Sequence, residues 1–178
     1  KVDQFADSTY PEFLVALAKL GQQGATRLVL DLRGNHGGFV QPAIRMAYEF
    51  LPGNRMVFYM QGRHSPRENF ISDGRGAHQS TPLIVLVDEQ TASASEIFAG
   101  SMQDNDRALI VGRRSFGKGL VQESIEFRDG SMLRLTIARY YMPSARCVQK
   151  PYTPGDLEEY EMDFINCIKS GELESGDS

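Results

Sequence analysis

Four short apolar runs, each rich in β-branched residues, constrain the fold of this 178-residue chain more than any other feature. They are "TRLVLDL" (26–32), "RMVFYMQG" (55–62), "PLIVLVDE" (82–89) and "ALIVG" (108–112). Continuous apolar runs of this length are typical of strands that are covered on both faces. We therefore expect a sheet of buried strands.

Segments with helical spacing alternate with these strands, and a hairpin follows them. The helical segments are "TYPEFLVALAKLG" (9–21), "VQPAIRMAYEFLPG" (40–53) and "SEIFAGSMQDN" (95–105). Beyond them the apolar period changes to two, and the turn signal Asp129-Gly130 separates "LVQESIEF" from "SMLRLTIARYY". The sequence therefore predicts an α/β domain with a mixed sheet, helices and a β-hairpin.

Size and composition exclude several classes of protein. With 41% hydrophobic residues the chain can bury one core, and we expect a single domain over residues 1–178. The formal net charge of -4 comes from dispersed acids, so we expect no nucleic-acid partner. No apolar run is long enough to span a membrane. Cys147 and Cys167 cannot complete a zinc site alone, and no metal is expected.

The chain becomes polar beyond Pro143, and its last part has the apolar spacing of a helix. Leu157, Tyr160, Phe164 and Ile168 recur on one helix face, which predicts a C-terminal helix packed on the core within 157–178. The final residues, "ELESGDS", are expected to fray.

Three segments rich in glycine or serine follow predicted strands, where α/β proteins place their active sites. They are "DLRGNHGG" (31–38), "TASASE" (91–96) and "SFGKG" (115–119). Each has a structural interpretation: a tight turn, a helix cap and an exposed lysine in a turn. Each also has a catalytic interpretation, because glycines can turn backbone N–H groups outward and a serine at a helix start lies beside further N–H groups.

The serine segment leaves both interpretations open. Ser93 or Ser95 can cap the following helix, and Ser93 with Glu96 has the spacing of a capping box. A nucleophilic serine needs a base, which is a histidine or a lysine.

The chain offers few candidates for that base. His64 and His78 bracket a polar segment that we interpret as a surface loop or lid, while His36 lies inside the glycine turn. Lys118 lies between two glycines at the entrance to a strand, an unusual place for a surface lysine.

Taken together, these segments resemble the carboxyl-terminal processing peptidases, also called tail-specific proteases. The resemblance runs from about Val2 to Asp156 and includes "DLRGNHGG", "TASASEIFAGSMQDNDRA", "GRRSFGKGLVQ" and "DGSMLRLTIARYYMPS". It implies a fold related to Clp protease and crotonase. The implied activity is that of a serine endopeptidase that cleaves proteins at or near their carboxyl termini through an acyl-enzyme, without a cofactor. By analogy the location is the bacterial periplasm or cell envelope.

The resemblance also assigns the Ser-Lys dyad. Ser93 corresponds to the nucleophile, Lys118 to the general base and Gln122 to the residue that holds the lysine in place. A lysine must lose its charge before it can accept a proton, and burial away from carboxylates favours that loss. We therefore expect Lys118 to be buried among apolar neighbours such as Phe116 and Leu120.

Further roles follow from the same resemblance. The oxyanion hole is expected from the N–H groups of Ala94 and of Gly37 or Gly38. The aspartate of the "QDN" segment, Asp104, corresponds to a residue with a supporting role in some members.

The chain also departs from the family pattern. A PDZ domain usually precedes this core and a final strand segment usually follows it. We expect neither in the given sequence, and therefore a folded domain that is weakly active or inactive. An uncovered sheet edge can pair with a second copy of the chain, which would give a homodimer. Two alternatives remain: a catalytically silent fragment or binding module of the same fold, and a crotonase-like acyl-CoA enzyme.

Overall fold

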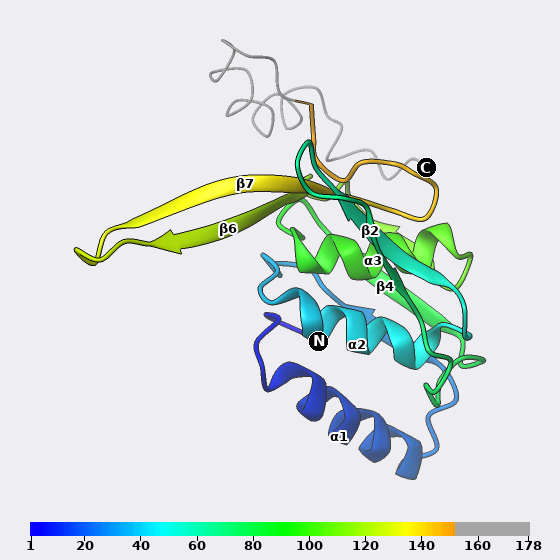
Figure 1. Ribbon diagram of the computed structural model, residues 1–178. Coiled ribbons are helices and arrows are strands. Elements are labelled where there is room, and N and C mark those ends of the chain that lie inside the picture. The colour runs from blue at the N-terminus through cyan, green and yellow to red at the C-terminus, as the bar shows by residue number, and fades with distance from the viewer. Residues whose placement is uncertain (152–178) are drawn as a thin grey trace, which may run out of the picture.

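The structure is a computed structural model, and it describes residues 1–151 (Figure 1). The helices of this part are α1 (Thr9–Gln22), α2 (Val40–Phe50) and α3 (Ala94–Asp104). Its strands are β1 (Leu28–Asp31), β2 (Met56–Gln61), β3 (Glu68–Ile71), β4 (Leu83–Val87), β5 (Leu109–Gly112), β6 (Leu120–Glu126) and β7 (Met132–Tyr141). The predicted α/β fold with a hairpin is confirmed. The predicted C-terminal helix and tail lie outside the described residues.

The parallel and antiparallel strands lie in separate sheets. One sheet is parallel in the order β1-β4-β5, and the other is antiparallel in the order β3-β2-β7-β6. The parallel register aligns the carboxyl ends of the first sheet, with Asp31 opposite Leu86 and Val87 opposite Gly112. The glycine, serine and lysine segments of the sequence therefore follow from one edge of this sheet.

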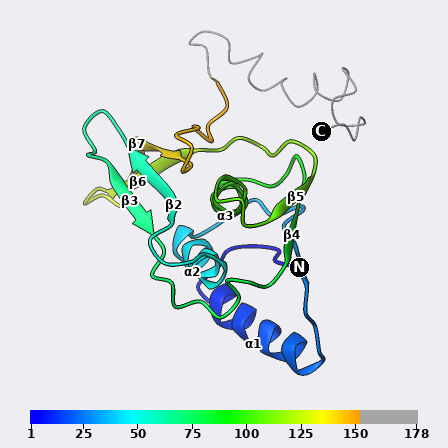
Figure 2. The same cartoon turned by 90° about the vertical axis from the view of Figure 1, so that its right-hand side faces the viewer.

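The core lies between the two sheets, where α2 and α3 are packed side by side (Figure 2). Phe50 of α2 meets Phe98 of α3 edge-on, with ring centroids 6.1 Å apart. Phe58 of β2 closes this core from the antiparallel sheet and is fully buried. Each such side chain contributes roughly 1.5–3 kcal/mol through burial. α3, which begins beside Ser93, is thus fixed by packing on both sides.

The expectation that all four apolar runs are covered on both faces is wrong for the parallel sheet. One face of this sheet packs on the helices, but side chains on the other face are 36–64% exposed. They are Val29, Ile84, Leu109 and Val111. The alternation of buried and exposed positions in β4 shows the physical reason: within residues 1–151 no element packs on the outer face.

The polar segment between His64 and His78 is not simply a surface loop or lid. Its central residues form β3, which pairs with β2, and Phe70 stacks on Phe58 with centroids 4.3 Å apart. The end of the segment is also fixed, because the guanidinium of Arg107 donates to the carbonyl of His78 at 2.7 Å. The sequence analysis missed this strand because its few apolar residues lie within a mostly polar segment.

The predicted hairpin is confirmed and projects from the body of the molecule (Figure 1). Its turn is closed by a hydrogen bond from the Phe127 N–H to the Ser131 carbonyl at 2.9 Å, and Gly130 has a φ of 83°. β2 pairs with β7 only at its end, from Arg139 to Tyr141.

Candidate active site

Ser93 lies in strained backbone at the sharp turn from β4 to α3. Its φ of 57° and ψ of -117° are rare for a residue with a side chain, and such strain costs roughly 1–3 kcal/mol. Ser93 is half-buried, whereas every other residue from 91 to 102 is buried. The turn therefore presents one reachable side chain at the carboxyl end of β4, as in strained turns that carry nucleophilic serines.

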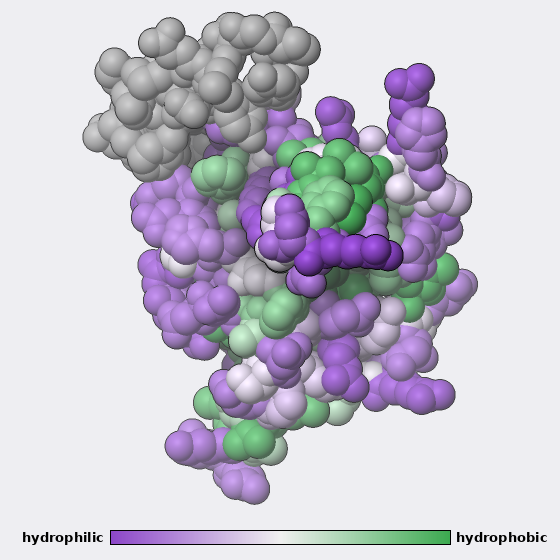
Figure 3. All heavy atoms as spheres, turned by 60° about the vertical axis from the view of Figure 1, so that its left-hand side comes forward, coloured by the Kyte–Doolittle hydropathy of each residue, from purple (hydrophilic) through white to green (hydrophobic). Residues whose placement is uncertain are grey.

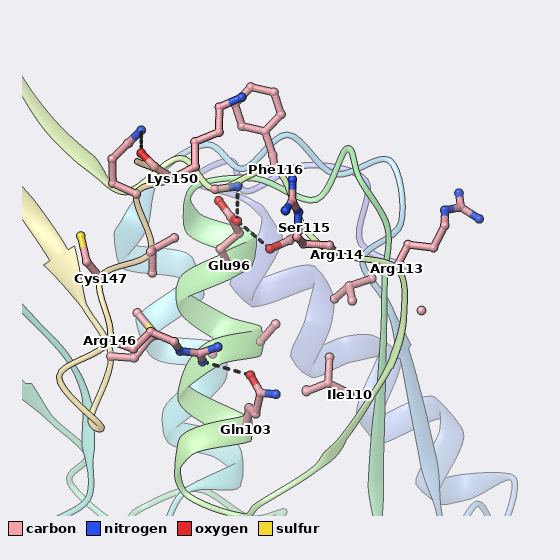
Figure 4. A pocket seen from close by; sticks show the side chains of 18 of the residues that line it. Glu96, Gln103, Ile110, Arg113, Arg114, Ser115, Phe116, Arg146, Cys147 and Lys150 are labelled. Atoms are coloured by element: carbon pink, nitrogen blue, oxygen red, sulfur yellow. Dashed lines mark hydrogen bonds between the residues drawn. The ribbon is translucent and has the colours of Figure 1, made fainter. Parts of the chain in front are cut away.

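Glu96, in the first turn of α3, joins the two segments that carry Ser93 and Lys118. Its Oε2 accepts the backbone N–H of Ser93 at 2.8 Å and that of Lys118 at 2.9 Å. Its Oε1 accepts the Ser115 hydroxyl at 2.7 Å and the Gly117 N–H at 2.6 Å (Figure 4). The carboxylate is thus buried but fully hydrogen-bonded. The capping-box spacing predicted only the first of these bonds.

The glycine turn packs directly against Ser93. A Cβ at Gly37 would lie 2.7 Å from the Ala92 carbonyl oxygen and 2.8 Å from the Ser93 Cβ. The φ of Gly37 is +95°, which also favours glycine. The turn reaches Ser93 only because this position has no side chain.

Backbone N–H groups around the turn differ in their availability. The Gly37 N–H donates to Oδ1 of Asn35 at 2.8 Å. Within residues 1–151, the N–H groups of Gly38 and Ala94 donate to no acceptor. Gly38 is exposed, whereas Gly37 and Ala94 are buried, so the Gly38 N–H is open to a ligand and the Ala94 N–H is without an acceptor but covered in this structure.

Asn35 ties the glycine turn to the serine turn, and sequence reasoning did not single it out. Its buried side chain donates to the Val2 carbonyl at 2.9 Å. Its own carbonyl accepts the Ala92 N–H at 3.0 Å and the Ser95 hydroxyl at 3.1 Å. Ser95 is fully buried and used in this bond, so its hydroxyl is a structural group.

Lys118 is exposed, and the prediction that it is buried is wrong for this structure. Phe116, a predicted covering neighbour, is itself 46% exposed. Within residues 1–151 the Lys118 amine forms no hydrogen bond or ion pair, including none with Ser93. The residue is held by its backbone, with the side chain directed to solvent.

The backbone on either side of Lys118 is held from two directions. Glu96 lies on one side, and on the other the Lys150 N–H donates to the Gly117 carbonyl at 3.0 Å. A Cβ at Gly119 would lie 2.4 Å from the backbone nitrogen of Gln149. The glycines that flank Lys118 therefore admit the neighbouring chain, which explains their place in "FGKG".

The structure does not bring Gln122 or Asp104 to Lys118. Gln122 is exposed on β6 opposite Thr136 and forms no hydrogen bond with Lys118. Asp104 ends α3, about 16 Å along the helix from Ser93 at 1.5 Å per residue. Its carboxylate accepts the Ser144 hydroxyl at 2.5 Å and pairs with Arg146 at 2.9 Å, which fixes the turn after β7.

The three histidines lie apart from one another. His36 is exposed in the glycine turn, and His64 is exposed in the connection from β2 to β3. His78 is half-buried, with its ring centroid 6.1 Å from that of Phe50. Among the described residues no hydrogen bond joins any of them to Ser93.

A cavity of about 700 Å³ lies behind the Lys118 segment, between α3, the β5–β6 connection and residues 142–151 (Figure 4). In the described part of the chain its wall is strongly basic, and Glu96 is the single acid among those lining residues. The lining cations are Arg113, Arg114, Arg146 and Lys150. Arg113 and Arg146 form ion pairs with Glu89 and Asp104.

An ion pair fixes the entrance to the glycine turn. The Arg33 guanidinium donates to both carboxylate oxygens of Asp31 at 2.9 Å. These hydrogen bonds lower the pKa of Asp31 to about 2.

No helix among the described residues is long and apolar enough to cross a membrane. Residues 1–151 also contain no group of three or more His, Cys, Asp or Glu side chains placed to hold a metal ion.

An α/β core with a serine in a strained strand-to-helix turn, next to free backbone N–H groups, is typical of serine hydrolases. Comparison with known proteins gives the family. The chain belongs to peptidase family S41, whose family model matches residues 1–158.

Individual relatives agree with this family. The carboxyl-terminal-processing protease of Synechocystis sp. is 43% identical over 150 residues, which cover 84% of this chain and 35% of that protein. The chloroplastic carboxyl-terminal-processing peptidase 1 of Arabidopsis thaliana is 38% identical over 144 residues, covering 81% of this chain and 29% of that protein. The chain therefore spans about a third of the length of such relatives.

A solved structure supports the same assignment. The photosystem II D1 C-terminal processing protease matches with a TM-score of 0.78 and 35% identity, over 83% of this chain and 38% of that one. The expected resemblance to the carboxyl-terminal processing peptidases is confirmed.

Proposed function

We propose that this chain is the catalytic core of a serine endopeptidase that cleaves protein substrates near their carboxyl termini with Ser93 and Lys118. The observation that carries the proposal is the Glu96 carboxylate. It binds the backbone of both residues while Ser93 stays strained and reachable. Family membership supports the peptidase activity.

The reaction divides into two steps. The Ser93 hydroxyl attacks the substrate carbonyl, its proton passes to a neutral Lys118 amine, and the same proton then goes to the leaving amine as the C–N bond breaks. Water hydrolyses the ester on Ser93, and its proton passes through Lys118 back to the serine oxygen. Atoms and charge balance over the cycle, and the serine is restored.

The oxyanion of each tetrahedral intermediate needs two donors beside Ser93. The N–H groups of Ala94 and Gly38 suit this role, because neither has an acceptor within residues 1–151. Gly37, the other residue that the sequence left open, uses its N–H on Asn35. We assign Gly37 the task of close packing on Ser93.

Lys118 needs a change of surroundings before it can act as the base. A charged amine in water cannot accept a proton, whereas a desolvated one loses its charge more readily. The exposed Lys118 of this structure is therefore a resting arrangement, and a substrate lying over it would supply the missing cover.

The substrate class rests on the relatives. The names of the Synechocystis and Arabidopsis relatives describe carboxyl-terminal processing, and relatives occur in bacteria and chloroplasts. For this chain we propose unfolded protein tails as substrates and a bacterial envelope as the location.

Two variants test the proposal. Ser93→Ala and Lys118→Ala should each abolish cleavage of casein and of a tail peptide. Ser93→Ala should also abolish labelling by a fluorophosphonate, which reacts with activated serines. Circular dichroism should show both variants folded. Labelling that persists in Ser93→Ala would reject the nucleophile. Near-normal cleavage by Lys118→Ala would reject the base and turn attention to His36.

The same label separates the alternatives. A binding module or an acyl-CoA enzyme of this fold has no activated serine, so labelling of the wild-type chain that is lost in Ser93→Ala would exclude both.

A further inference from the structure

Within residues 1–151, the β6–β7 hairpin carries a sheet edge without a partner, and this edge starts two residues after the proposed base, Lys118. β6 is the last strand in the order β3-β2-β7-β6. It begins at Leu120, two residues after Lys118, and continues outward to Glu126. Because β2 pairs only with Arg139–Tyr141 of β7, the outer part of the hairpin is a lone two-stranded ribbon. Such ribbons are marginally stable by themselves.

The register shows which backbone groups of β6 point away from β7. The Tyr140 N–H donates to the Gly119 carbonyl, and the Phe127 N–H donates to the Ser131 carbonyl, so residues 119 and 127 face β7. Along two antiparallel strands, residues whose backbone groups bond to the partner strand alternate with residues whose backbone groups point away from it. Leu120, Gln122, Ser124 and Glu126 therefore direct their N–H and C=O groups to the free edge. This row extends about 20 Å at 3.3 Å per residue.

The two faces of the hairpin differ in character. Ile125 lies opposite Leu133, and Phe127 and Leu135 lie on the same face, where all four side chains are 41–50% exposed. The other face carries polar pairs such as Ser124 with Arg134. Figure 3, in which the hairpin comes toward the viewer, shows apolar surface gathered on one side of it and polar surface on the other.

The hairpin is also well placed for a long substrate. Figures 1 and 2 agree that β6 is the strand nearer to α2, so the free edge faces the end of the molecule where the glycine turn leads into α2. Phe39, which follows Gly38 in that turn, is 59% exposed.

We propose that β6 is the docking strand for the substrate, which adds to its free edge as an extended chain. This inference rests on the proposed peptidase function and specifies how a polypeptide would bind. Main-chain hydrogen bonds give affinity with little dependence on sequence, and alternate side chains meet the apolar face. The edge begins at Leu120, two residues after Lys118, and the β6–β7 register shifts once, between Val121 and Gln122. A peptide strand that extends past the start of β6 would therefore lie next to the exposed lysine.

The direct test is residue-resolved amide exchange of the Ser93→Ala protein, with and without a short peptide of alternating leucine and serine. Because this variant is used for binding alone, the result does not depend on catalysis. Peptide binding should slow exchange of the outward N–H groups of Gln122, Ser124 and Glu126. The inward N–H groups of Glu123 and Ile125 should change little.

A pair of proline variants tests the same edge without exchange data. Ser124→Pro removes one outward N–H of β6, while Arg134→Pro removes one from the cross-strand neighbour on the opposite edge of the hairpin. Neither N–H belongs to the β6–β7 ladder, so both variants should fold. Ser124→Pro should weaken peptide binding about fivefold, as expected for one lost hydrogen bond and its neighbours. Arg134→Pro should bind like the parent protein.

The outcomes are distinct. Protection of Gln122, Ser124 and Glu126 in a period of two supports the proposal, even if either proline variant fails to fold. Protection at β3, on the outer face of the parallel sheet, or nowhere would overturn it. Slowed exchange that depends on protein concentration without peptide would replace it with self-association. If the wild-type chain neither cleaves nor labels, the peptidase proposal fails, and the exchange result still decides whether β6 binds extended peptides.

Discussion

Ser93 and Lys118 donate their backbone N–H groups to the same oxygen atom, Oε2 of Glu96, at 2.8 and 2.9 Å. The two residues belong to different connections of the parallel sheet, so no local rule of chain geometry fixes their separation. A buried carboxylate does so, and its own position is fixed because it lies on the first turn of a buried helix. Glu96 is therefore a positioning residue for the proposed dyad.

Glu96→Gln should lower kcat for peptide cleavage at least tenfold and change KM little. The glutamine amide has one acceptor oxygen, so its NH2 group would face two N–H or O–H donors that the carboxylate now accepts. A small displacement of a catalytic pair is costly, on the order of a hundredfold in rate for about 1 Å. Steady-state kinetics with a peptide substrate measure both constants.

Glu89→Gln is the matched control for this variant. Glu89 is an acid of the neighbouring loop, it pairs with Arg113 at 2.6 Å, and it does not contact Ser93 or Lys118. Its loss should leave kcat within about twofold, because partly exposed ion pairs contribute little. An equal fall in kcat for both variants would show that Glu96 acts only through general stability or charge.

Gly37→Ala should inactivate the protein and destabilise it. The added Cβ would lie 2.7 Å from the Ala92 carbonyl oxygen and 2.8 Å from the Ser93 Cβ, and the φ of +95° disfavours any side chain. We expect a loss of about 2–3 kcal/mol in the free energy of unfolding, with activity reduced more than about a hundredfold. Urea denaturation and fluorophosphonate labelling measure the two effects.

Gly24 provides the comparison. Its φ is +81°, but a Cβ there would meet nothing within 4 Å. Gly24→Ala should therefore cost about 1–2 kcal/mol from backbone strain alone and keep its labelling rate. If Gly37→Ala labels as fast as Gly24→Ala, the glycine turn does not shape the site around Ser93.

Sequence reasoning predicted the order of strands and helices well, because hydrophobic period and turn signals are local. The strand "PLIVLVDE" and the helix after Ser93 are examples. β3 was not predicted, because its pairing depends on a contact between Phe70 and Phe58 that only the folded sheet creates. The exposed face of the parallel sheet was not predicted for a similar reason: an apolar run does not show whether another element packs on it.

In the candidate site, too, features with a local sequence signal could be predicted, and features that depend on distant contacts could not. The glycine turn and the serine turn could be located from local motifs, but the motifs left Ser93 and Ser95 open, and the family resemblance alone selected Ser93. The network of Glu96 and Asn35 could not be located in this way, because their partners lie far apart in sequence. Lys118 was expected to be buried because a catalytic base must be uncharged, but the side chain is exposed. The requirement applies to the state in which the reaction takes place, and it does not show that the amine is buried in the protein without substrate.

Ser95→Ala should separate the two serines of the "SASE" segment. The Ser95 hydroxyl donates to the Asn35 carbonyl at 3.1 Å inside the core, so its loss removes one buried hydrogen bond. We expect a loss of about 1 kcal/mol in the free energy of unfolding and continued fluorophosphonate labelling at Ser93. Mass spectrometry of the labelled peptide identifies the modified serine. A label found on Ser95 in the wild-type chain would reverse the proposed assignment.

Asp31→Asn should lower the free energy of unfolding only above about pH 2. Two hydrogen bonds from the Arg33 guanidinium lower the pKa of Asp31 to about 2, below the value of an unfolded chain. The ionised form is therefore stabilised by folding, and this stabilisation is present near neutral pH and disappears as the pH falls through about 4 toward 2. Because the Arg33 side chain is 55% exposed, the contribution is at most about 1 kcal/mol. Urea denaturation of both proteins between pH 7 and pH 3 should show a difference that shrinks by about half at the acid end. A difference that stays constant over this range would mean that the asparagine disturbs packing and that the charge of Asp31 contributes nothing.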